Sequence, residues 1–229
     1  MKGFILAGGK GTRLRPITYE IPKALLPIEG EPILNYLVDL YLQADIGEIK
    51  INIRKKHKKS FLKWRDEYYK NRKISFLIEK EPSGTLGPLI KSKDWFDELL
   101  VVSNGDELKD ISLDKFINWH KEKELASIAL VEVEKPQSYG VAVLEGSKII
   151  KFIEKPENPP TNYINSGLYI LDPEVKKSFP EKDFAMLERD LFPLLAEKGS
   201  LYGYKWSGRW QDTGTLERYE RAIKNWNNE

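Results

Sequence analysis

The chain has 229 residues, of which 41% are hydrophobic, enough for the core of one domain or of two closely joined lobes. Its 37 basic and 35 acidic residues nearly balance, so net charge gives no argument for nucleic acid or an anionic membrane as a partner. The absence of cysteine excludes disulfides and thiolate metal sites, and two histidines leave little material for a histidine-rich metal site or a Ser-His-Asp triad.

The first half of the chain alternates short apolar runs with amphipathic stretches of helical length. We expect strands at 4–7, 49–53, 74–78 and 99–103, and helices at 33–44, 61–70 and 86–95. This alternation predicts a parallel α/β sheet flanked by helices. Ligands bind such sheets beyond the carboxyl ends of the strands, and two loops of the chain occupy that position.

The second half has a different pattern, with short β-rich runs separated by turns. We expect strands at 127–133, 141–144, 148–153 and 165–171, followed by helices at 184–197 and 216–226. No linker, repeat or low-complexity tract interrupts the chain. The sequence therefore predicts one domain with two lobes, divided near residue 125 into 1–125 and 126–229.

No apolar run reaches the length of a membrane span. A core strand pattern begins directly after Met1 and leaves no room for a signal peptide. We therefore expect a cytoplasmic protein with neither a membrane nor a nucleic acid as its partner.

The loop after the first strand reads Gly8-Gly9-Lys10-Gly11-Thr12-Arg13. Glycines allow backbone N–H groups to approach a ligand closely, and the neighbouring Arg13 and Arg15 suit a polyanion such as a triphosphate. The glycine spacing matches neither the Walker pattern nor the dinucleotide pattern, and a plain strand-to-helix turn is the alternative. Lys23, in a loop stiffened by flanking prolines, favours phosphate binding.

Two aspartates are candidates for a metal site. Asp106 follows a buried strand in Asn104-Gly105-Asp106, and Asp212 lies in Trp210-Gln-Asp-Thr-Gly-Thr215, directly before the last predicted helix. Mg²⁺ prefers carboxylates and phosphates as ligands. Either aspartate taken alone is equally compatible with an ordinary turn. Thr215 is expected to cap the helix that follows.

Three further motifs contain candidate binding residues. Lys155 of Glu154-Lys155-Pro156 could reach a second phosphate or stand as a surface turn cation. The amide of Asn165, at the start of a strand, could bind hydroxyl groups. The turn 81–87 could read a base edge through its backbone. Each of these motifs could also be structural.

Taken together, these motifs resemble those of the sugar-1-phosphate nucleotidyltransferases, also called nucleotide-sugar pyrophosphorylases. The resemblance covers nearly the whole chain. It implies a Rossmann-like, mixed and mostly parallel sheet flanked by helices, with a smaller β-rich sugar-binding lobe. The matching segments are 6–16, 22–27, 81–87, 104–106, 139–141, 152–156, 165–169 and 210–214.

The resemblance also implies a role for individual residues. Nucleotide binding falls to Leu6, Ala7, Gly8, Gly9, Gly11, Thr12, Arg13, Lys23, Glu81, Gly84, Thr85 and Gly105. Sugar-phosphate binding falls to Tyr139, Gly140, Glu154, Lys155, Asn165, Gly167 and Glu188. The catalytic residues are Arg13, Lys23, Asp106 and Lys155, and the ligands of Mg²⁺, the implied cofactor, are Asp106 and Asp212.

The implied reaction joins an NTP to a sugar 1-phosphate and releases pyrophosphate. The turn 81–87 favours GTP with mannose or heptose 1-phosphate, whereas 210–215 is also close to glucose-1-phosphate thymidylyltransferases, so dTTP or UTP with glucose 1-phosphate is the alternative. The chain carries no hexapeptide repeats of a C-terminal left-handed β-helix. A homodimer is left open.

Two other functions remain as alternatives. The first is a cytidylyltransferase acting on CTP and phosphocholine, for which an aromatic cage could hold the quaternary ammonium. The cage candidates are Tyr139, Tyr169, Trp206 and Trp210. The second is a catalytically silent regulatory paralogue. Retention of the complete set of predicted catalytic and metal-binding residues argues against it.

Overall fold

The structure is a computed structural model that describes residues 1–226. The chain divides into two compact units, which are considered separately. The N-terminal unit comprises Lys2–Pro82, Ser103–Asp110 and the chain from Arg209 onward, and the central unit comprises Met1, Ser83–Val102 and Ile111–Gly208. The expected division into lobes 1–125 and 126–229 stays a prediction.

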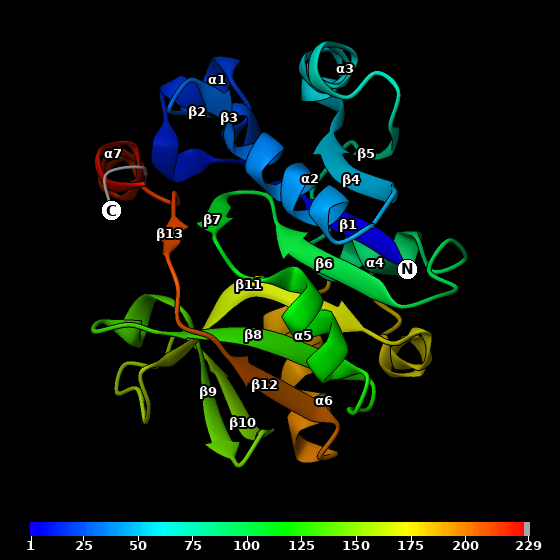
Figure 1. The fold of residues 1–229 in the computed structure, drawn as a ribbon, viewed down its shortest axis with the longest axis vertical. Helices are drawn as coiled ribbons and strands as arrows, with labels where there is room; N and C mark the ends of the chain where they lie inside the picture. Colours follow the sequence, from blue (N-terminus) through cyan, green and yellow to red (C-terminus); the bar gives the residue numbers. More distant parts are fainter. Residues whose placement is uncertain (227–229) are drawn as a thin grey trace. The chain divides into compact units, whose positions relative to one another are not determined.

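The N-terminal unit is built on three parallel strands in the order β5-β4-β1 (Figure 1). Its strands are β1 (Lys2–Leu6), β2 (Pro27–Ile28), β3 (Glu31–Pro32), β4 (Glu48–Arg54), β5 (Lys73–Glu79), β7 (Glu107–Lys109) and β13 (Trp210–Asp212). Its helices are α1 (Ile17–Glu20), α2 (Ile33–Gln43), α3 (Lys58–Tyr68) and α7 (Leu216–Asn225).

Helix α2 packs directly on β1, because Gly3 leaves room for an aromatic ring. A Cβ at Gly3 would lie 2.5 Å from the ring of Tyr41, and the Tyr41 hydroxyl donates to the Phe4 carbonyl at 3.2 Å. Both Tyr41 and Phe4 are fully buried. This contact places the carboxyl end of β1, and the glycine-rich loop after it, on a rigid support.

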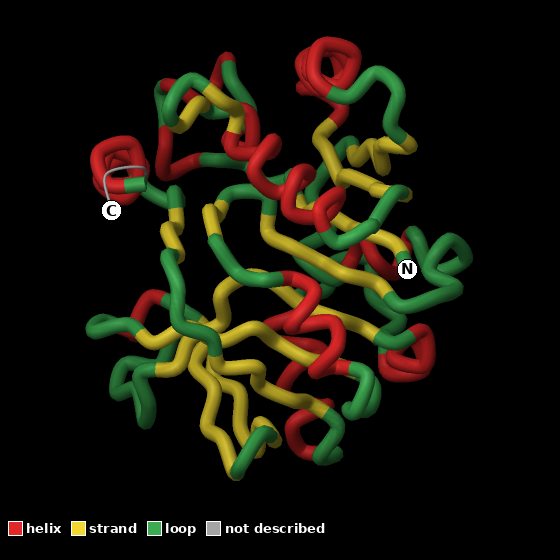
Figure 2. The backbone as a smooth tube through the Cα atoms, in the orientation of Figure 1, coloured by secondary structure: helices red, strands yellow, loops and turns green. Residues whose placement is uncertain are grey.

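The central unit contains a mixed sheet in the order β6-β11-β8-β12-β10-β9 (Figure 2). The pair β8–β12 is parallel, and the pairs β11–β8, β10–β12 and β10–β9 are antiparallel. Its strands are β6 (Leu100–Asn104), of which Ser103–Asn104 belong to the N-terminal unit, β8 (Ala126–Glu132), β9 (Gly140–Glu145), β10 (Lys148–Glu154), β11 (Tyr163–Leu171) and β12 (Leu201–Lys205). Its helices are α4 (Gly87–Lys91), α5 (Leu113–His120), the π-helical turn η6 (Leu187–Leu191) and α6 (Phe192–Glu197).

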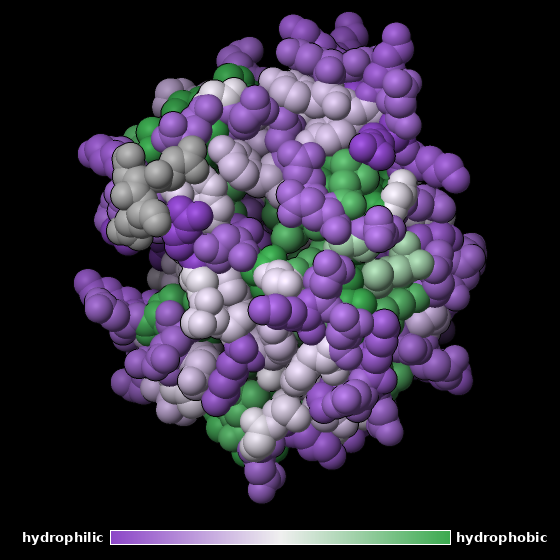
Figure 3. Space-filling model, in the orientation of Figure 1, coloured by the Kyte–Doolittle hydropathy of each residue, from purple (hydrophilic) through white to green (hydrophobic). Residues whose placement is uncertain are grey.

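The predicted α/β class is confirmed. Within the central unit, aromatic side chains pack helix α6 against the sheet. The Phe192 ring of α6 lies 5.3 Å from that of Phe152 on β10 and 5.0 Å from that of Tyr169 on β11, measured between centroids. The face drawn in Figure 3 is mostly hydrophilic, with apolar atoms in separate patches. Within residues 1–226, no helix is long and apolar enough to cross a membrane.

Two predicted helices are shorter than expected. The helix expected at 184–197 begins only with η6 at Leu187, because Ala185 is held in an extended segment by tertiary hydrogen bonds. Its N–H donates to Ser83 O at 3.0 Å, and its carbonyl accepts from Leu86 N at 2.9 Å. The helix expected at 86–95 ends at Lys91 and continues as hydrogen-bonded turns.

His120 on α5 makes the stability of the protein depend on pH. The ring is 3% exposed, and Nδ1 lies 2.7 Å from Ser127 Oγ on β8. Burial lowers the pKa of His120 to about 4, against a smaller opposing effect of Asp172. An unfolded chain, with a histidine pKa near 6.5, takes up the proton first. Above about pH 6.5, His120 is neutral in both states and does not lower the free energy of unfolding. The free energy of unfolding then falls as the pH drops from about 6.5 towards 4.

Replacing His120 by glutamine is expected to remove part of this acid sensitivity. Between pH 7.5 and 5.5 the wild-type free energy of unfolding should fall by about 1 kcal/mol more than that of His120→Gln. Urea unfolding at both pH values measures the difference. Equal pH dependence in the two proteins would contradict it. The variant keeps the acid sensitivity due to His57, whose pKa is also lowered by burial, with Lys56 and Arg54 adding to the effect.

Candidate active site

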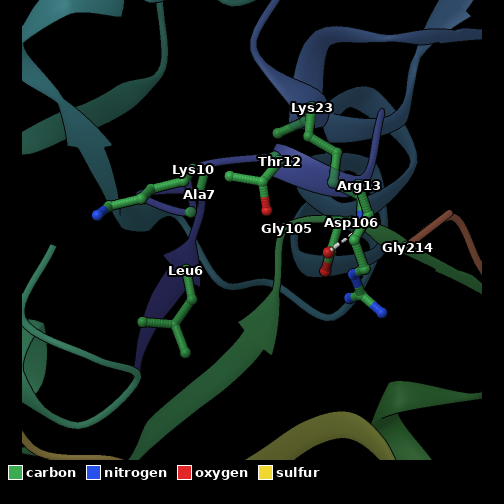
Figure 4. Close-up of a pocket in the computed structure, with 12 residues that line it drawn as sticks. Leu6, Ala7, Lys10, Thr12, Arg13, Lys23, Gly105, Asp106 and Gly214 are labelled. Carbon is green, nitrogen blue, oxygen red and sulfur yellow. Dashed lines mark hydrogen bonds and ion pairs between the residues drawn. The ribbon is translucent and has the colours of Figure 1, made fainter. Parts of the chain in front are cut away.

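The glycine-rich loop after β1 lines a cavity of about 240 Å³ in the N-terminal unit (Figure 4). Gly11 has φ +63°, a left-handed conformation that favours glycine, and its carbonyl accepts from Thr18 Oγ1 at 2.6 Å. The cavity combines open backbone with cationic side chains, a lining suited to polyphosphate. Its lining residues are Leu6, Ala7, Gly9, Lys10, Gly11, Thr12, Arg13, Lys23, Ala24, Gly105, Asp106 and Gly214.

A buried amide holds the start of this loop. The N–H of Gly8 donates to Asn52 Oδ1 at 3.0 Å, and Asn52 Nδ2 donates to Glu79 Oε2 at 2.8 Å. A Cβ at Gly8 would lie 3.0 Å from Asn52 Cγ. The N–H of Gly8 is therefore bonded within the protein and helps to fix the loop. Gly8 itself does not line the cavity.

Lys23 and Asp106 form an ion pair at the cavity. Their side chains are 13% and 35% exposed, so solvent screens the pair only in part. Burial by itself would raise the pKa of Asp106, but Lys23, helped by Lys109 and Arg13, lowers it below its ordinary value. Asp106 is thus held as a carboxylate. Figure 4 shows Arg13, Lys23 and Asp106 close together, whereas Lys10 extends in another direction.

Asp212 lies near Asp106 because β13 pairs with β7. Asp212 stands opposite Glu107, the neighbour of Asp106. Thr213 joins the two segments, since its N–H and Oγ1 both donate to the Asp106 carbonyl, at 3.2 Å and 2.7 Å. A Cβ at Gly214 would lie 2.7 Å from Asp212 Oδ1 and 3.2 Å from an Arg13 guanidinium nitrogen. The predicted aspartates and Arg13 are therefore brought together within one unit.

Arg218 of α7 is the ion-pair partner of Asp212. Helix α7 begins where predicted, with the Thr215 side chain accepting from Arg218 N at 3.3 Å, so the expected cap is confirmed. The cap fixes the first turn of α7 and so places Arg218 beside the carboxylate. The sequence could have indicated Arg218, because it lies in the first turn of the helix that follows Thr215.

Glu107 was not predicted, yet it is the most perturbed carboxyl group of the ribbon formed by β7 and β13. Burial, together with the charges of Asp106 and Asp212, raises the pKa of Glu107 to about 7 against the opposing effect of Lys109. Burial lowers the pKa of Lys109, and the charge of Glu107 opposes this shift in part. Perturbed pKa values of this kind often occur at functional sites.

The central unit brings together a second group of predicted residues. Glu154 and Gly140 are paired across β10 and β9, and a Cβ at Gly140 would lie 3.1 Å from Glu154 Oε2. Lys155 follows with φ +50°, a strained conformation for a residue with a side chain, and its N–H donates to Tyr139 O at 3.0 Å. Its Nζ lies 3.1 Å from Glu154 Oε1 and is exposed.

Glu188 lies against the turn that contains Gly84 and Thr85. Its Oε2 accepts from Thr85 Oγ1 at 2.6 Å, and Thr85 Oγ1 accepts from Leu187 N at 2.9 Å. Burial raises the pKa of Glu188, opposed by the Thr85 hydrogen bond, and the nearby Glu154 raises it further. Glu154, Lys155, Glu188 and Thr85 thus form one cluster.

Both polar atoms of the Asn165 amide already make hydrogen bonds within the protein. Its Nδ2 donates to the Tyr169 hydroxyl at 2.9 Å, and its Oδ1 accepts from Gly167 N at 2.8 Å. Gly167 has φ +64°, and the β11–β8 register shifts between Asn165 and Tyr169. The adjacent Ile164 pairs with Val141 of β9, so this bulge lies next to the strand that begins with Gly140.

The predicted nucleotide-binding residues are divided between the two units. Glu81 belongs to the N-terminal unit but lies outside the cavity, with an exposed side chain 3.7 Å from Arg54. Gly84 and Thr85 belong to the central unit. The ligand roles of all these residues stay predictions. Residues at the sites that sequence reasoning missed are Lys10, Ala24, Asn52, Glu79, Glu107, Lys109, Gly214 and Arg218.

Asp106 and Asp212 are the donors that a metal ion would find in the N-terminal unit. Within residues 1–226, no group of three or more His, Cys, Asp or Glu side chains is arranged to hold a metal. Mg²⁺ is commonly held by one or two carboxylates together with substrate phosphates and water. Two carboxylates beside a cavity suited to polyphosphate fit that pattern.

The chain is similar to known proteins in both sequence and structure. The nucleotidyl transferase family model matches residues 2–229, which confirms the resemblance read from the motifs. The catalytic subunit beta of mannose-1-phosphate guanylyltransferase from Danio rerio is 34% identical over 223 residues. That alignment covers 93% of this chain and 61% of the relative, so the chain spans about three fifths of the relative's length.

Solved structures are similar over nearly the whole chain. A protein described as a glucose-1-phosphate thymidylyltransferase from Bacillus anthracis is 29% identical with a TM-score of 0.90, over 98% of this chain and 94% of that one. HddC from Yersinia pseudotuberculosis, complexed with GMP-PN, is 28% identical with a TM-score of 0.83, over 99% of both chains.

Proposed function

Because this chain belongs to the nucleotidyl transferase family, we propose that it joins an NTP to a sugar 1-phosphate, forming a nucleoside-diphosphate sugar and pyrophosphate. An oxygen of the sugar phosphate forms a bond to the α-phosphorus of the NTP. The bond from that phosphorus to the pyrophosphate oxygen breaks, and pyrophosphate leaves with the electron pair. The attacking phosphate is already anionic, so the reaction needs no general base.

The observation that carries this proposal is the cavity formed by the glycine-rich loop, Arg13, Lys23 and Asp106. In-line phosphoryl chemistry depends on positioning and on neutralising phosphate charge. The loop backbone supplies N–H groups, and Arg13 and Lys23 supply positive charge. Both needs are met by side chains that the fold already holds in place, with Lys23 fixed by its ion pair to Asp106.

We assign Asp106 and Asp212 as the protein ligands of Mg²⁺. A bound Mg²⁺ neutralises phosphate charge that Arg13 and Lys23 leave uncompensated. The two carboxylates are joined through Thr213, which bonds to the Asp106 carbonyl. The ion pair with Arg218 orients the Asp212 side chain. The oxygen-only donor set suits a hard divalent cation.

The cluster of the central unit is assigned to the sugar phosphate. The exposed Nζ of Lys155 is available to the phosphate, while Glu154 and Glu188 offer acceptors to sugar hydroxyls. The strained backbone of Lys155 supports a functional role, since such strain collects at binding sites. We assign Asn165 a structural role in β11, because its amide already bonds to Tyr169 and Gly167 and has few hydrogen-bonding positions left for a sugar.

For the substrate pair we favour GTP with mannose 1-phosphate or heptose 1-phosphate. The relative from Danio rerio is a mannose-1-phosphate guanylyltransferase, and the similar structure of HddC is a complex with GMP-PN. The second candidate is dTTP or UTP with glucose 1-phosphate. It is favoured by the similar structure from Bacillus anthracis, described as a glucose-1-phosphate thymidylyltransferase. Cytoplasmic location and homodimer formation stay predictions.

The phosphocholine alternative loses part of its support. Tyr169, one of the aromatic candidates for a cage around a quaternary ammonium, is fully buried and holds Asn165 through its hydroxyl. A ring without an open face cannot bind a cation by that mechanism. We therefore rank a sugar phosphate above phosphocholine as the acceptor.

A pyrophosphate-release assay tests the proposed function. Each common NTP is combined with mannose, heptose, glucose and N-acetylglucosamine 1-phosphates and with phosphocholine, in the presence of Mg²⁺. We expect the highest kcat/KM with GTP and mannose or heptose 1-phosphate. A maximum with dTTP or UTP and glucose 1-phosphate would select the second candidate. Release with CTP and phosphocholine alone, or with no pair, would overturn the proposal and favour a cytidylyltransferase or a silent paralogue.

A further inference from the structure

The ribbon of β7 and β13 contains a buried polar cluster that the proposed reaction leaves without a role. Glu107 accepts hydrogen bonds from Asn104 Nδ2 at 2.8 Å and from Trp210 Nε1 at 3.0 Å, and it forms an ion pair with Lys109 at 3.5 Å. Glu107 and Lys109 are 7% and 6% exposed. Desolvating such a pair often costs as much free energy as the attraction returns, so stability alone does not account for it.

Glu107 of this cluster neighbours both aspartates. Asp106 directly precedes Glu107, and Asp212 stands opposite Glu107 across the ribbon. Residues directly opposite in an antiparallel pair share a face, so two carboxyl groups, those of Glu107 and Asp212, form a facing pair, which destabilises a ribbon when both are ionised. A local rule broken in this way is typical of a functional site.

The bonds of Glu107 show what the cluster does. Both of its carboxylate oxygens are already occupied, Oε1 by Asn104 and Oε2 by Trp210 and Lys109. Glu107 is therefore poorly placed to bind a ligand itself. Its bond to Trp210 crosses from β7 to β13 and joins the segment that contains Asp106 to the segment that contains Asp212.

A second connection completes the arrangement. Thr213 is fully buried and donates twice to the Asp106 carbonyl. The Glu107–Trp210 bond and the Thr213–Asp106 bonds together determine how β13 lies against β7. A shift of β13 along β7 would break both connections and separate the two carboxylates.

We propose that Glu107 is a positioning residue that holds Asp106 and Asp212 in register through its hydrogen bond to Trp210. This inference rests on the proposed function, which gives the two aspartates a divalent cation to share. Groups that orient metal ligands typically change metal affinity or activity by about 10–100-fold when they are lost. The cluster therefore acts on metal affinity through the positions of Asp106 and Asp212.

Trp210→Phe tests the proposal, because it removes the indole N–H and keeps an aromatic ring. Trp64→Phe is its matched control. Trp64 belongs to the same unit, is 3% exposed and donates through Nε1 to Asn35 Oδ1 at 2.7 Å. Trp64→Phe therefore removes one indole hydrogen bond, as Trp210→Phe does. Three quantities are measured in each protein: the Mg²⁺ concentration for half-maximal activity, Mn²⁺ binding in the presence of GTP by electron paramagnetic resonance, and the Tm.

We expect Trp210→Phe to raise the Mg²⁺ concentration for half-maximal activity at least about fivefold and to weaken Mn²⁺ binding by a similar factor. Its KM for GTP should stay within about twofold of wild type, because the loop and Lys23 are unchanged. Trp64→Phe should lower the Tm comparably and leave both metal measurements within about twofold. Glu107→Gln, which keeps an acceptor for the indole, should lie closer to wild type than Glu107→Ala.

Two results in the variants overturn the proposal: wild-type metal behaviour in Trp210→Phe, or an equal shift in Trp64→Phe. Failure of the proposed function is seen separately, as a wild-type protein that releases pyrophosphate with no substrate pair. In that case the Mn²⁺ titration still decides the positioning role. A wild-type protein that binds no Mn²⁺ in the presence of GTP overturns the inference as well.

Discussion

Replacing Asp106 by asparagine is expected to lower kcat for nucleotidyl transfer about 100-fold or more while the protein stays folded. The substitution keeps the shape of the side chain and removes its charge. Lys23 then loses its ion-pair partner, and the proposed metal site loses one of two carboxylates. Turnover as a function of Mg²⁺ concentration measures the effect, and circular dichroism with urea unfolding shows whether the fold is retained.

Asp110→Asn is the matched control for Asp106→Asn. Asp110 makes the same kind of contact at the far end of β7, where its carboxylate accepts from Arg209 Nε at 3.2 Å, but it lies outside the cavity. We expect Asp110→Asn to retain activity within about twofold, since an exposed ion pair contributes little. Full activity in Asp106→Asn would remove the metal assignment. Equal losses in the two variants would show that the ribbon is merely sensitive to any change of charge.

Replacing Gly84 by alanine is expected to lower the free energy of unfolding by at least about 3 kcal/mol. Gly84 has φ +89°, and an added Cβ would collide with the Ala185 carbonyl oxygen and lie 2.8 Å from its carbon. Backbone atoms cannot turn aside as a side chain can. The same carbonyl accepts from Leu86 N and Gly87 N, so movement of either segment breaks hydrogen bonds. Urea unfolding measures the loss.

Gly30→Ala separates the collision from the backbone strain. Gly30 has φ +84°, nearly that of Gly84, but an added Cβ there meets nothing within 4 Å. We expect this variant to lose only about 1–2 kcal/mol, the cost of a left-handed residue with a side chain. The difference between the variants is then the contribution of the contact between Gly84 and Ala185. Similar losses at both positions would contradict the collision.

The apolar strands of the N-terminal unit were predictable because they are local patterns. Runs such as 4–7 and 49–53 are continuous stretches of buried residues, and β1 and β4 differ from them by only a few residues at the ends. The ribbon strands β7 and β13 could not be predicted in the same way. Each is three residues long and polar, and each is a strand only because the other pairs with it from about 100 residues away in the chain.

The same distinction explains the missed buried charges. In the sequence, Glu107 and Lys109 look like an exposed turn, since charged residues are almost never buried without partners. Their partners are Asn104 nearby and Trp210 far along the chain, and pairing supplies both burial and hydrogen bonds. Local reasoning likewise extended a helix through Ala185, whose backbone is held by Ser83 and Leu86.

Four features could be predicted from local sequence alone: the α/β class, the glycine-rich loop with its cations, the position of Asp106 after a buried strand, and the Thr215 cap. Each of these depends on residues that are neighbours in the chain. Three contacts are seen only in the folded chain: Thr213, next to Asp212, bonds to Asp106, Asn52 accepts from the N–H of Gly8, and Glu107 joins β7 to β13. These contacts join distant segments, and their free energy comes from burial and pairing that no single segment provides.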